Sequence, residues 1–113
     1  MNTRVFLLIS LLTACGRLLA QDNELSMIRI QESLYGSNTG NTSYLVIVHP
    51  DLSTTRIELE NLERGKNAEV NAAKIAEEMH KLLSQGFSIQ SCSIGTGDQL
   101  MSTMVVMTRP SKK

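Results

Sequence analysis

Aromatic side chains and an excess of either charge are scarce in this 113-residue sequence. It has no tryptophan, two tyrosines and two phenylalanines, so it offers few rings to stack on nucleic-acid bases or to anchor a binding hot spot. Its eleven Lys and Arg residues are balanced by eleven Asp and Glu residues. A neutral chain lacks the basic patch that binds nucleic acid, and we therefore expect no nucleic-acid partner.

Cysteine is scarce too, which excludes a fold that is stabilised by several disulfides. The two cysteines, Cys15 and Cys92, are also too few for a cysteine-based zinc site. Cys92 lies in the segment 88–94, which has no cation or histidine that would stabilise a thiolate. We therefore predict that Cys92 is a small, unreactive strand residue.

The N-terminus carries a targeting signal. Arg4 is followed by the apolar run 5–14 and by small residues, which is the arrangement of a secretory signal peptide. The run has about ten residues, whereas a membrane-spanning helix needs roughly twenty. We predict that residues 1–20 are a signal peptide cleaved after Ala20. The protein is then exported to the periplasm or the extracellular space, and its mature chain has no transmembrane segment.

A second interpretation of the same segment stays open. Residues 12–15, Leu-Thr-Ala-Cys, resemble a bacterial lipobox. In that case residues 1–14 are a lipoprotein signal and Cys15 becomes the lipidated first residue of a membrane-anchored lipoprotein. Removing the first twenty residues leaves nine cations against eleven acidic residues, so the mature chain is slightly acidic and nucleic acid is disfavoured further.

The hydrophobic pattern predicts a single domain over residues 26–110, between a flexible lead-in at 21–25 and a tail at 111–113. Strands are indicated where apolar residues alternate with polar ones or form short β-branched runs. The expected strands are 27–34, 44–48, 54–60, 87–93 and 101–108. Polar or Gly-containing segments at 36–43, 49–51 and 95–98 separate several of them as loops and turns.

Between the third and fourth strands, apolar residues spaced by three to four predict an amphipathic helix. Asn67 is expected to cap its start, and Gly86 to end it in a left-handed conformation. The predicted apolar stripe comprises Val70, Ala73, Ile75, Ala76, Met79, Leu82 and Leu83, and the solvent face comprises Asn71, Lys74, Glu77, Glu78 and Lys81. The order β-β-β-α-β-β predicts an α+β fold, with an antiparallel sheet of four to five strands and one helix packed on one face.

The segment 76–91 reads Ala-Glu-Glu-Met-His-Lys-Leu-Leu-Ser-Gln-Gly-Phe-Ser-Ile-Gln-Ser, and a Gly-containing turn and an apolar strand follow it. This pattern resembles a small bacterial domain of unknown function, whose helix ends in Leu-x-x-x-Gly-Trp-Glu-Leu-Val-Ser before a β-hairpin. Phe87 stands here in place of that Trp, and Ser88 in place of the Glu. Exported members with an extra N-terminal hairpin are similar over residues 26–110. The family has no established activity, so the resemblance implies a fold and no catalytic residues.

Two histidines are the candidates for chemistry at neutral pH. Glu77 and His80 lie on adjacent turns of the predicted helix, a spacing that can hold a metal, and His49 joins them only if its turn folds nearby. Zinc sites use three or four protein ligands, so we favour the interpretation that Glu77 and His80 belong to an ordinary solvent-exposed helix face. No metal or cofactor is therefore expected. The sequence also lacks the Gly-x-Ser-x-Gly and Ser-x-x-Lys motifs of serine hydrolases.

These features favour an exported, non-enzymatic bacterial binding or structural module. An exposed sheet edge can accept a strand from a protein partner or from a second copy, which makes a homodimer. The alternative is a small periplasmic metal-binding protein or hydrolase that uses His80, Glu77 and His49. Asp98, in the last turn, would join the histidines if a pocket gathered them.

Overall fold

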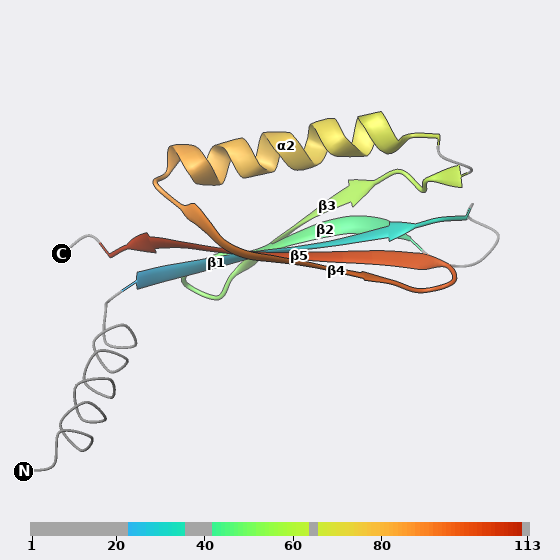
Figure 1. Ribbon diagram of the computed structural model, residues 1–113. Coiled ribbons are helices and arrows are strands. Elements are labelled where there is room, and N and C mark those ends of the chain that lie inside the picture. The colour runs from blue at the N-terminus through green and yellow to red at the C-terminus, as the bar shows by residue number, and fades with distance from the viewer. Residues whose placement is uncertain (1–22, 36–41, 64–65, 112–113) are drawn as a thin grey trace, which may run out of the picture.

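The computed structural model describes residues 23–35, 42–63 and 66–111 (Figure 1). The predicted signal peptide at 1–20, the lipidation candidate Cys15 and most of the predicted loop at 36–43 lie outside the described residues. The described segments contain every predicted strand and the predicted helix.

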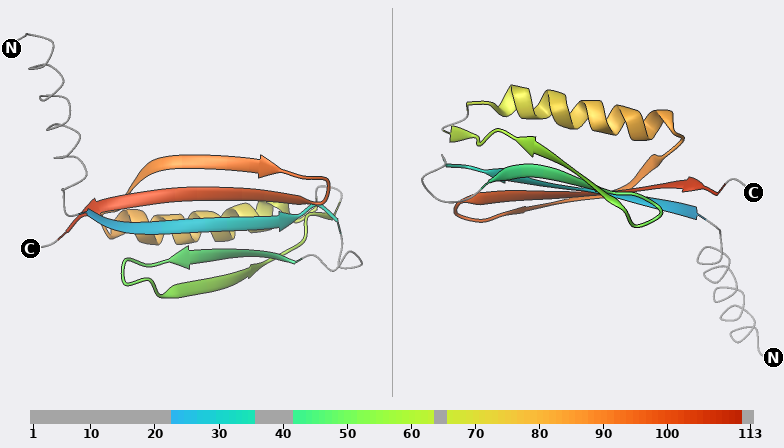
Figure 2. Two further views of the ribbon diagram at one scale, coloured as in Figure 1. Left: turned by 90° about the horizontal axis from the view of Figure 1, so that it is seen from below. Right: turned by 180° about the vertical axis from the view of Figure 1, so that it is seen from behind.

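The elements follow the predicted order β-β-β-α-β-β. They are β1 (Asn23–Ser33), β2 (Ser43–Val48), β3 (Thr54–Leu59), α2 (Ala68–Ser84), β4 (Ser88–Thr96) and β5 (Leu100–Pro110). The strands form one antiparallel sheet in the order β3-β2-β1-β5-β4, and α2 lies across one face of it (Figures 1 and 2). The predicted α+β class is therefore confirmed, with β1 at the centre and β3 and β4 at the edges.

The central strand β1 begins earlier than the sequence predicts. Residues 23–25, which we expected to belong to a flexible lead-in, pair with the end of β5, where Asn23 lies opposite Pro110. Glu24 accepts a hydrogen bond from the guanidinium of Arg109. The lead-in prediction is wrong for these residues, because pairing with a long neighbouring strand outweighs their weak local preference for extended structure.

The core lies between α2 and the sheet face beneath it. Alternation along the strands places Ile28 of β1, Leu45 of β2 and Met107 of β5 in this layer, and all three are fully buried. Ile28 lies opposite Ile47 on one side and Val105 on the other, so the apolar layer continues across the three central strands. The other buried apolar residues are Ile30, Leu59, Leu82 and Phe87.

The predicted helix surface needs a correction at Asn71. We expected this residue on the solvent face, but its side chain is fully buried, while Val70 and Leu83 of the predicted apolar stripe are exposed. The face of α2 that meets the sheet runs from Asn71 through Ile75 to Leu82. The prediction failed because spacing of apolar residues cannot reveal a polar side chain that serves the backbone of a neighbouring strand.

The two helix ends differ in how well the sequence predicts them. Asn67 occupies the N-cap position with φ 70°, but its side chain makes no capping bond and instead donates to the backbone oxygen of Asn61, at 3.0 Å. At the other end Gly86 has φ +93°, as predicted for a left-handed terminus. Its N–H donates to the backbone oxygen of Leu83, at 3.0 Å.

Candidate functional site

The predicted catalytic and metal-binding candidates occupy separate elements. His49 follows β2, and its Nε2 lies 2.7 Å from the hydroxyl of Thr55. His80 is exposed on α2, where the neighbouring Glu77 carboxylate lies 3.8 Å from the ammonium of Lys81. Within residues 23–35, 42–63 and 66–111, no group of three His, Cys, Asp or Glu side chains could hold a metal ion.

The remaining candidates lie in the β4–β5 hairpin. Asp98 is exposed in the turn, and Cys92 is a free, exposed cysteine in β4, so its predicted strand position is confirmed. The strand extends further than predicted, since Gly95 belongs to β4 and the turn closes where Gly97 N–H donates to Leu100 O, at 2.8 Å. As for membranes, the described residues include no helix of the length and apolarity that a span requires.

One edge of the sheet, at the end of β3, is occupied by a side chain of α2. The Oδ1 of Asn71 accepts a hydrogen bond from the N–H of Glu60 at 2.8 Å, and its Nδ2 donates to the carbonyl of the same residue at 2.7 Å. An adjoining strand would use these same two backbone groups. Nδ2 also lies 3.1 Å from the carboxylate of Glu32, which holds the amide in place.

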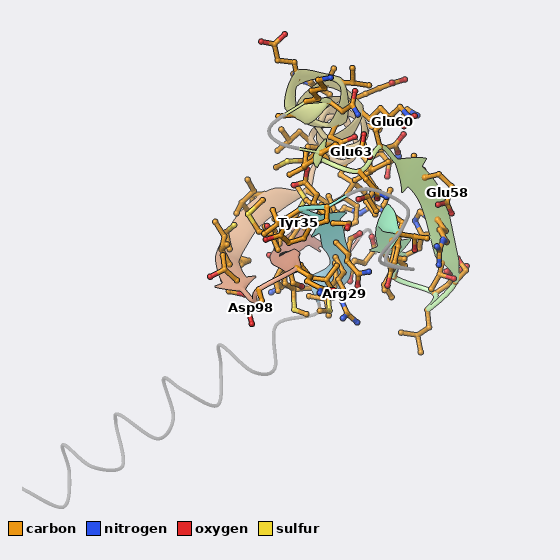
Figure 3. The ribbon with its side chains drawn as sticks, turned by 90° about the vertical axis from the view of Figure 1, so that its right-hand side faces the viewer. Arg29, Tyr35, Glu58, Glu60, Glu63 and Asp98 are labelled. Carbon is orange, nitrogen blue, oxygen red and sulfur yellow. The ribbon has the colours of Figure 1, made fainter. Side chains whose placement is uncertain are left out.

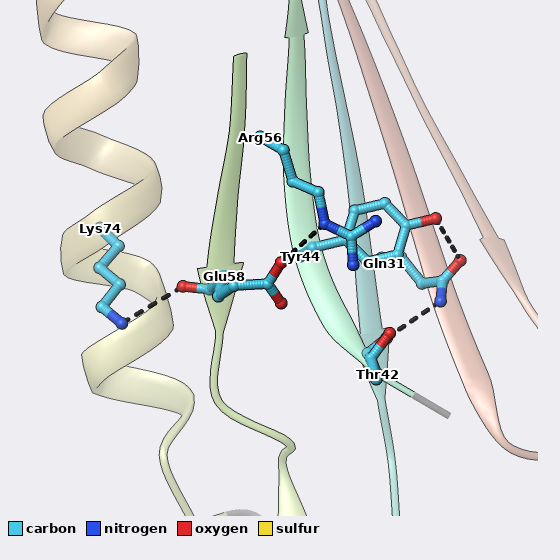
Figure 4. A network of polar contacts seen from close by, with 6 residues as sticks. All are labelled: Gln31, Thr42, Tyr44, Arg56, Glu58 and Lys74. Atoms are coloured by element: carbon cyan, nitrogen blue, oxygen red, sulfur yellow. Dashed lines mark hydrogen bonds and ion pairs between the residues drawn. The ribbon is translucent and has the colours of Figure 1, made fainter. Parts of the chain in front are cut away.

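Charged side chains cover β3 further along (Figure 4). The Nζ of Lys74 donates to the backbone oxygen of Glu58, at 3.3 Å. Arg56 pairs with the Glu58 carboxylate at 2.7 Å and lies 3.9 Å above the ring of Tyr44, and the hydrogen bond to Glu58 raises the pKa of Arg56. The Tyr44 hydroxyl in turn donates to Gln31. Short length, charge and occupied backbone groups are the features by which edge strands avoid further pairing.

The opposite edge, β4, lacks these protections. All nine of its residues are exposed, and none is charged or proline. Among the described residues, the side-chain hydrogen bonds of β4 are those of Ser88 and Gln90 near its start, and neither reaches the backbone of β4. A long, exposed and uncharged edge strand is a template for pairing with another strand.

A bulge gives β4 an apolar side. The register shifts between Ile89 and Ser91, and after the shift Cys92 and Ile94 lie on the same side as Ile89. This is the α2 side, because the strand partners of Ile89 and Cys92 on β5 are buried core residues. Ile89 is nevertheless 49% exposed and Ile94 66% exposed. α2 therefore does not cover the side chains of these two isoleucines.

The sheet face away from α2 carries an exposed arginine, Arg29 (Figure 3). Arg29 lies on this face between Val46 of β2 and Met104 of β5, and it makes no hydrogen bond or ion pair to the described residues. Burying an unpaired guanidinium is costly. Arg29 therefore opposes the docking of an apolar surface on this face and leaves β4 as the more suitable interaction surface.

The sequence contains a signal for the free edge β4, which our predictions from the sequence missed. Residues 88–97 contain no charge, whereas the other edge segment, 54–60, contains Arg56, Glu58 and Glu60. This absence of charge can be interpreted only once the two edge strands of the sheet are known. Strand order depends on long-range pairing of β1 with β5, which local patterns do not specify.

Comparison with protein families, with curated proteins and with solved structures found no match. The resemblance to a small bacterial domain therefore stays a prediction. The function is inferred from the geometry of the chain itself.

Proposed function

We propose that this protein is an exported, non-enzymatic bacterial binding module that takes up a partner by adding a strand to the free edge of β4. The contrast between the two edges carries the proposal. Side chains of α2 bond the backbone at and after the end of β3, at Glu58 and Glu60, while the backbone of β4 has no such cover in the described part of the chain. Strand addition supplies main-chain hydrogen bonds to the partner, and exposed side chains such as Ile94 supply apolar contact.

Export rests on the N-terminal sequence alone. Arg4 and the short apolar run after it support cleavage after Ala20 and release to the periplasm or extracellular space. The alternative is cleavage before Cys15 and anchoring as a lipoprotein. Mass spectrometry of the mature N-terminus distinguishes the two, because a diacylglycerol on Cys15 eliminates the released form and an unmodified Gln21 eliminates the anchored one.

Site-specific cross-linking tests the binding proposal. A photo-reactive amino acid replaces Ser93 in β4, and in a matched control it replaces Thr54 in β3; both positions are exposed. The full chain is produced in an exporting bacterial host and irradiated, and adducts are identified by mass spectrometry. Protein adducts from position 93 but not from position 54 are expected. Equal adducts from both positions, or none from position 93, would rule the proposal out.

A further inference from the structure

We propose that the strand added to β4 belongs to a second copy of this chain, so that two sheets join edge to edge in a two-fold symmetric dimer. This inference rests on the proposed function and names its partner. Closed two-fold pairs are the commonest form of protein self-association, and in them one surface patch meets itself. A candidate edge must therefore be complementary to itself.

β4 meets this condition. With the two-fold axis through Ser93, antiparallel pairing places Cys92 opposite Ile94 of the second copy, and Ile94 opposite the second Cys92. Ser91 then faces Gly95, and the two Ser93 side chains meet on the other side of the sheet. Apolar residues pair with apolar residues and small polar residues with small ones, and no charges are brought together.

The exposed apolar side chains near β4 support the same arrangement. A two-fold axis perpendicular to the sheet keeps the α2 sides of both copies on one face, so Ile89 and Ile94 of the two copies gather there. Leu83 of α2 adds to them. Leu83 lies nine residues, or two and a half helical turns, from Lys74 and therefore on the opposite side of α2. Because Lys74 reaches β3, Leu83 lies on the side of the helix that is nearer to β4, where it is 44% exposed.

The other surfaces of the described chain do not offer this self-complementarity. The backbone at and beyond the end of β3 already bonds Asn71 and Lys74. The open sheet face has the unpaired Arg29 near its centre. The two copies therefore meet along β4, with pairing confined to residues after the bulge, 91–95.

Sedimentation equilibrium of the exported mature chain tests the dimer. Two variants place a lysine on an exposed strand position, Ile94→Lys on β4 and the matched Thr54→Lys on β3. Each dimer loses two isoleucine contacts in Ile94→Lys, and its association constant should fall roughly a hundredfold, whereas Thr54→Lys should stay within about twofold of the parent. Circular dichroism confirms that both variants fold. A parent chain that stays monomeric up to about 1 mM, or equal loss in both variants, would overturn the dimer.

A thiol experiment tests the register independently. In the parent dimer the two Cys92 residues are diagonal neighbours about 7–8 Å apart, which is too far for a good disulfide. Ile94→Cys places the new thiol opposite Cys92 of the second copy, and oxidised glutathione should then convert it largely to a disulfide-linked dimer. A linked fraction no greater than that of the parent would contradict the pairing through Ser93. If the chain is monomeric but position 93 cross-links to another protein, the dimer is ruled out and the proposed function is kept.

Discussion

Asn71 of α2 bonds both the N–H and the carbonyl of Glu60, the residue that follows β3. One buried amide thus takes the place of a neighbouring strand at this end of the sheet. By contrast, no side chain of the described residues bonds the backbone of β4. A helix residue on one side of the sheet therefore helps to decide where a partner strand can add.

Replacing Asn71 should destabilise the fold. Asn71→Ala leaves the N–H and carbonyl of Glu60 without partners and is expected to lower the free energy of unfolding by about 2 kcal/mol. Urea denaturation measures the change. His80→Ala, at an exposed position of the same helix, should change it by less than about 0.5 kcal/mol. Equal effects in the two variants would show that the amide does not hold the β3 edge.

The core and the free edge should respond differently to truncation of isoleucine. Ile28 is fully buried, so Ile28→Ala should cost about 2–5 kcal/mol of stability. Ile94 is 66% exposed, and Ile94→Ala should cost less than about 0.5 kcal/mol when the protein is dilute enough to be monomeric. Denaturation of both variants at low protein concentration checks this difference. A large loss for Ile94→Ala under those conditions would mean that β4 is covered within one chain.

The end of α2 depends on the backbone conformation of one glycine. Gly86 has φ +93°. Apart from its two chain neighbours, no described residue has an atom within 4 Å of the position that an added Cβ would take, so the cost of Gly86→Ala is conformational and not steric. We expect a loss of about 1 kcal/mol. Gly95 also has open space and an ordinary φ, and Gly95→Ala is the control, with little change expected. Thermal unfolding of the two variants compares them, and an equal response would contradict the assigned conformation.

Asp51 should titrate below the ordinary aspartate range. The hydroxyl and the backbone N–H of Ser53 both donate to its carboxylate, which lowers the pKa of Asp51 from 3.8. Because the pKa is lowered in the folded state, these bonds stabilise the turn above the unfolded pKa and are lost as the pH falls through the folded one. Carboxyl chemical shifts in NMR follow this titration. Ser53→Ala should move the midpoint upward, and an unchanged midpoint would show that the hydroxyl has no effect.

Local patterns sufficed for the types and order of the elements. Alternation identified the strands that contain Ile28 and Ile57, and a short β-branched run identified the strand that contains Leu45. The left-handed end of α2 was predicted from Gly86. These features depend on side-chain periodicity and on the freedom of glycine, both of which are encoded within a few residues.

The misjudged features depend on residues far apart in the chain. Asn71 is buried because Glu32, 39 residues away, and Glu60, 11 residues away, meet its amide. Residues 23–25 are ordered because β5 pairs with them. Which strands form the edges, and so which backbone groups stay free, likewise follows from the pairing of β1 with β5. No local window of the sequence contains this information.

Hydrogen exchange of the β4 amides tests the central claim, that the edge of β4 accepts a strand from a second copy of this chain. Peptides covering β4 and β3 are followed by mass spectrometry as the concentration of the mature chain increases. The dimer predicts that the β4 amides pointing away from β5 become protected with concentration, while those of β3 do not change. Protection that increases in β3 instead, or β4 amides that exchange equally fast at every concentration, would contradict it.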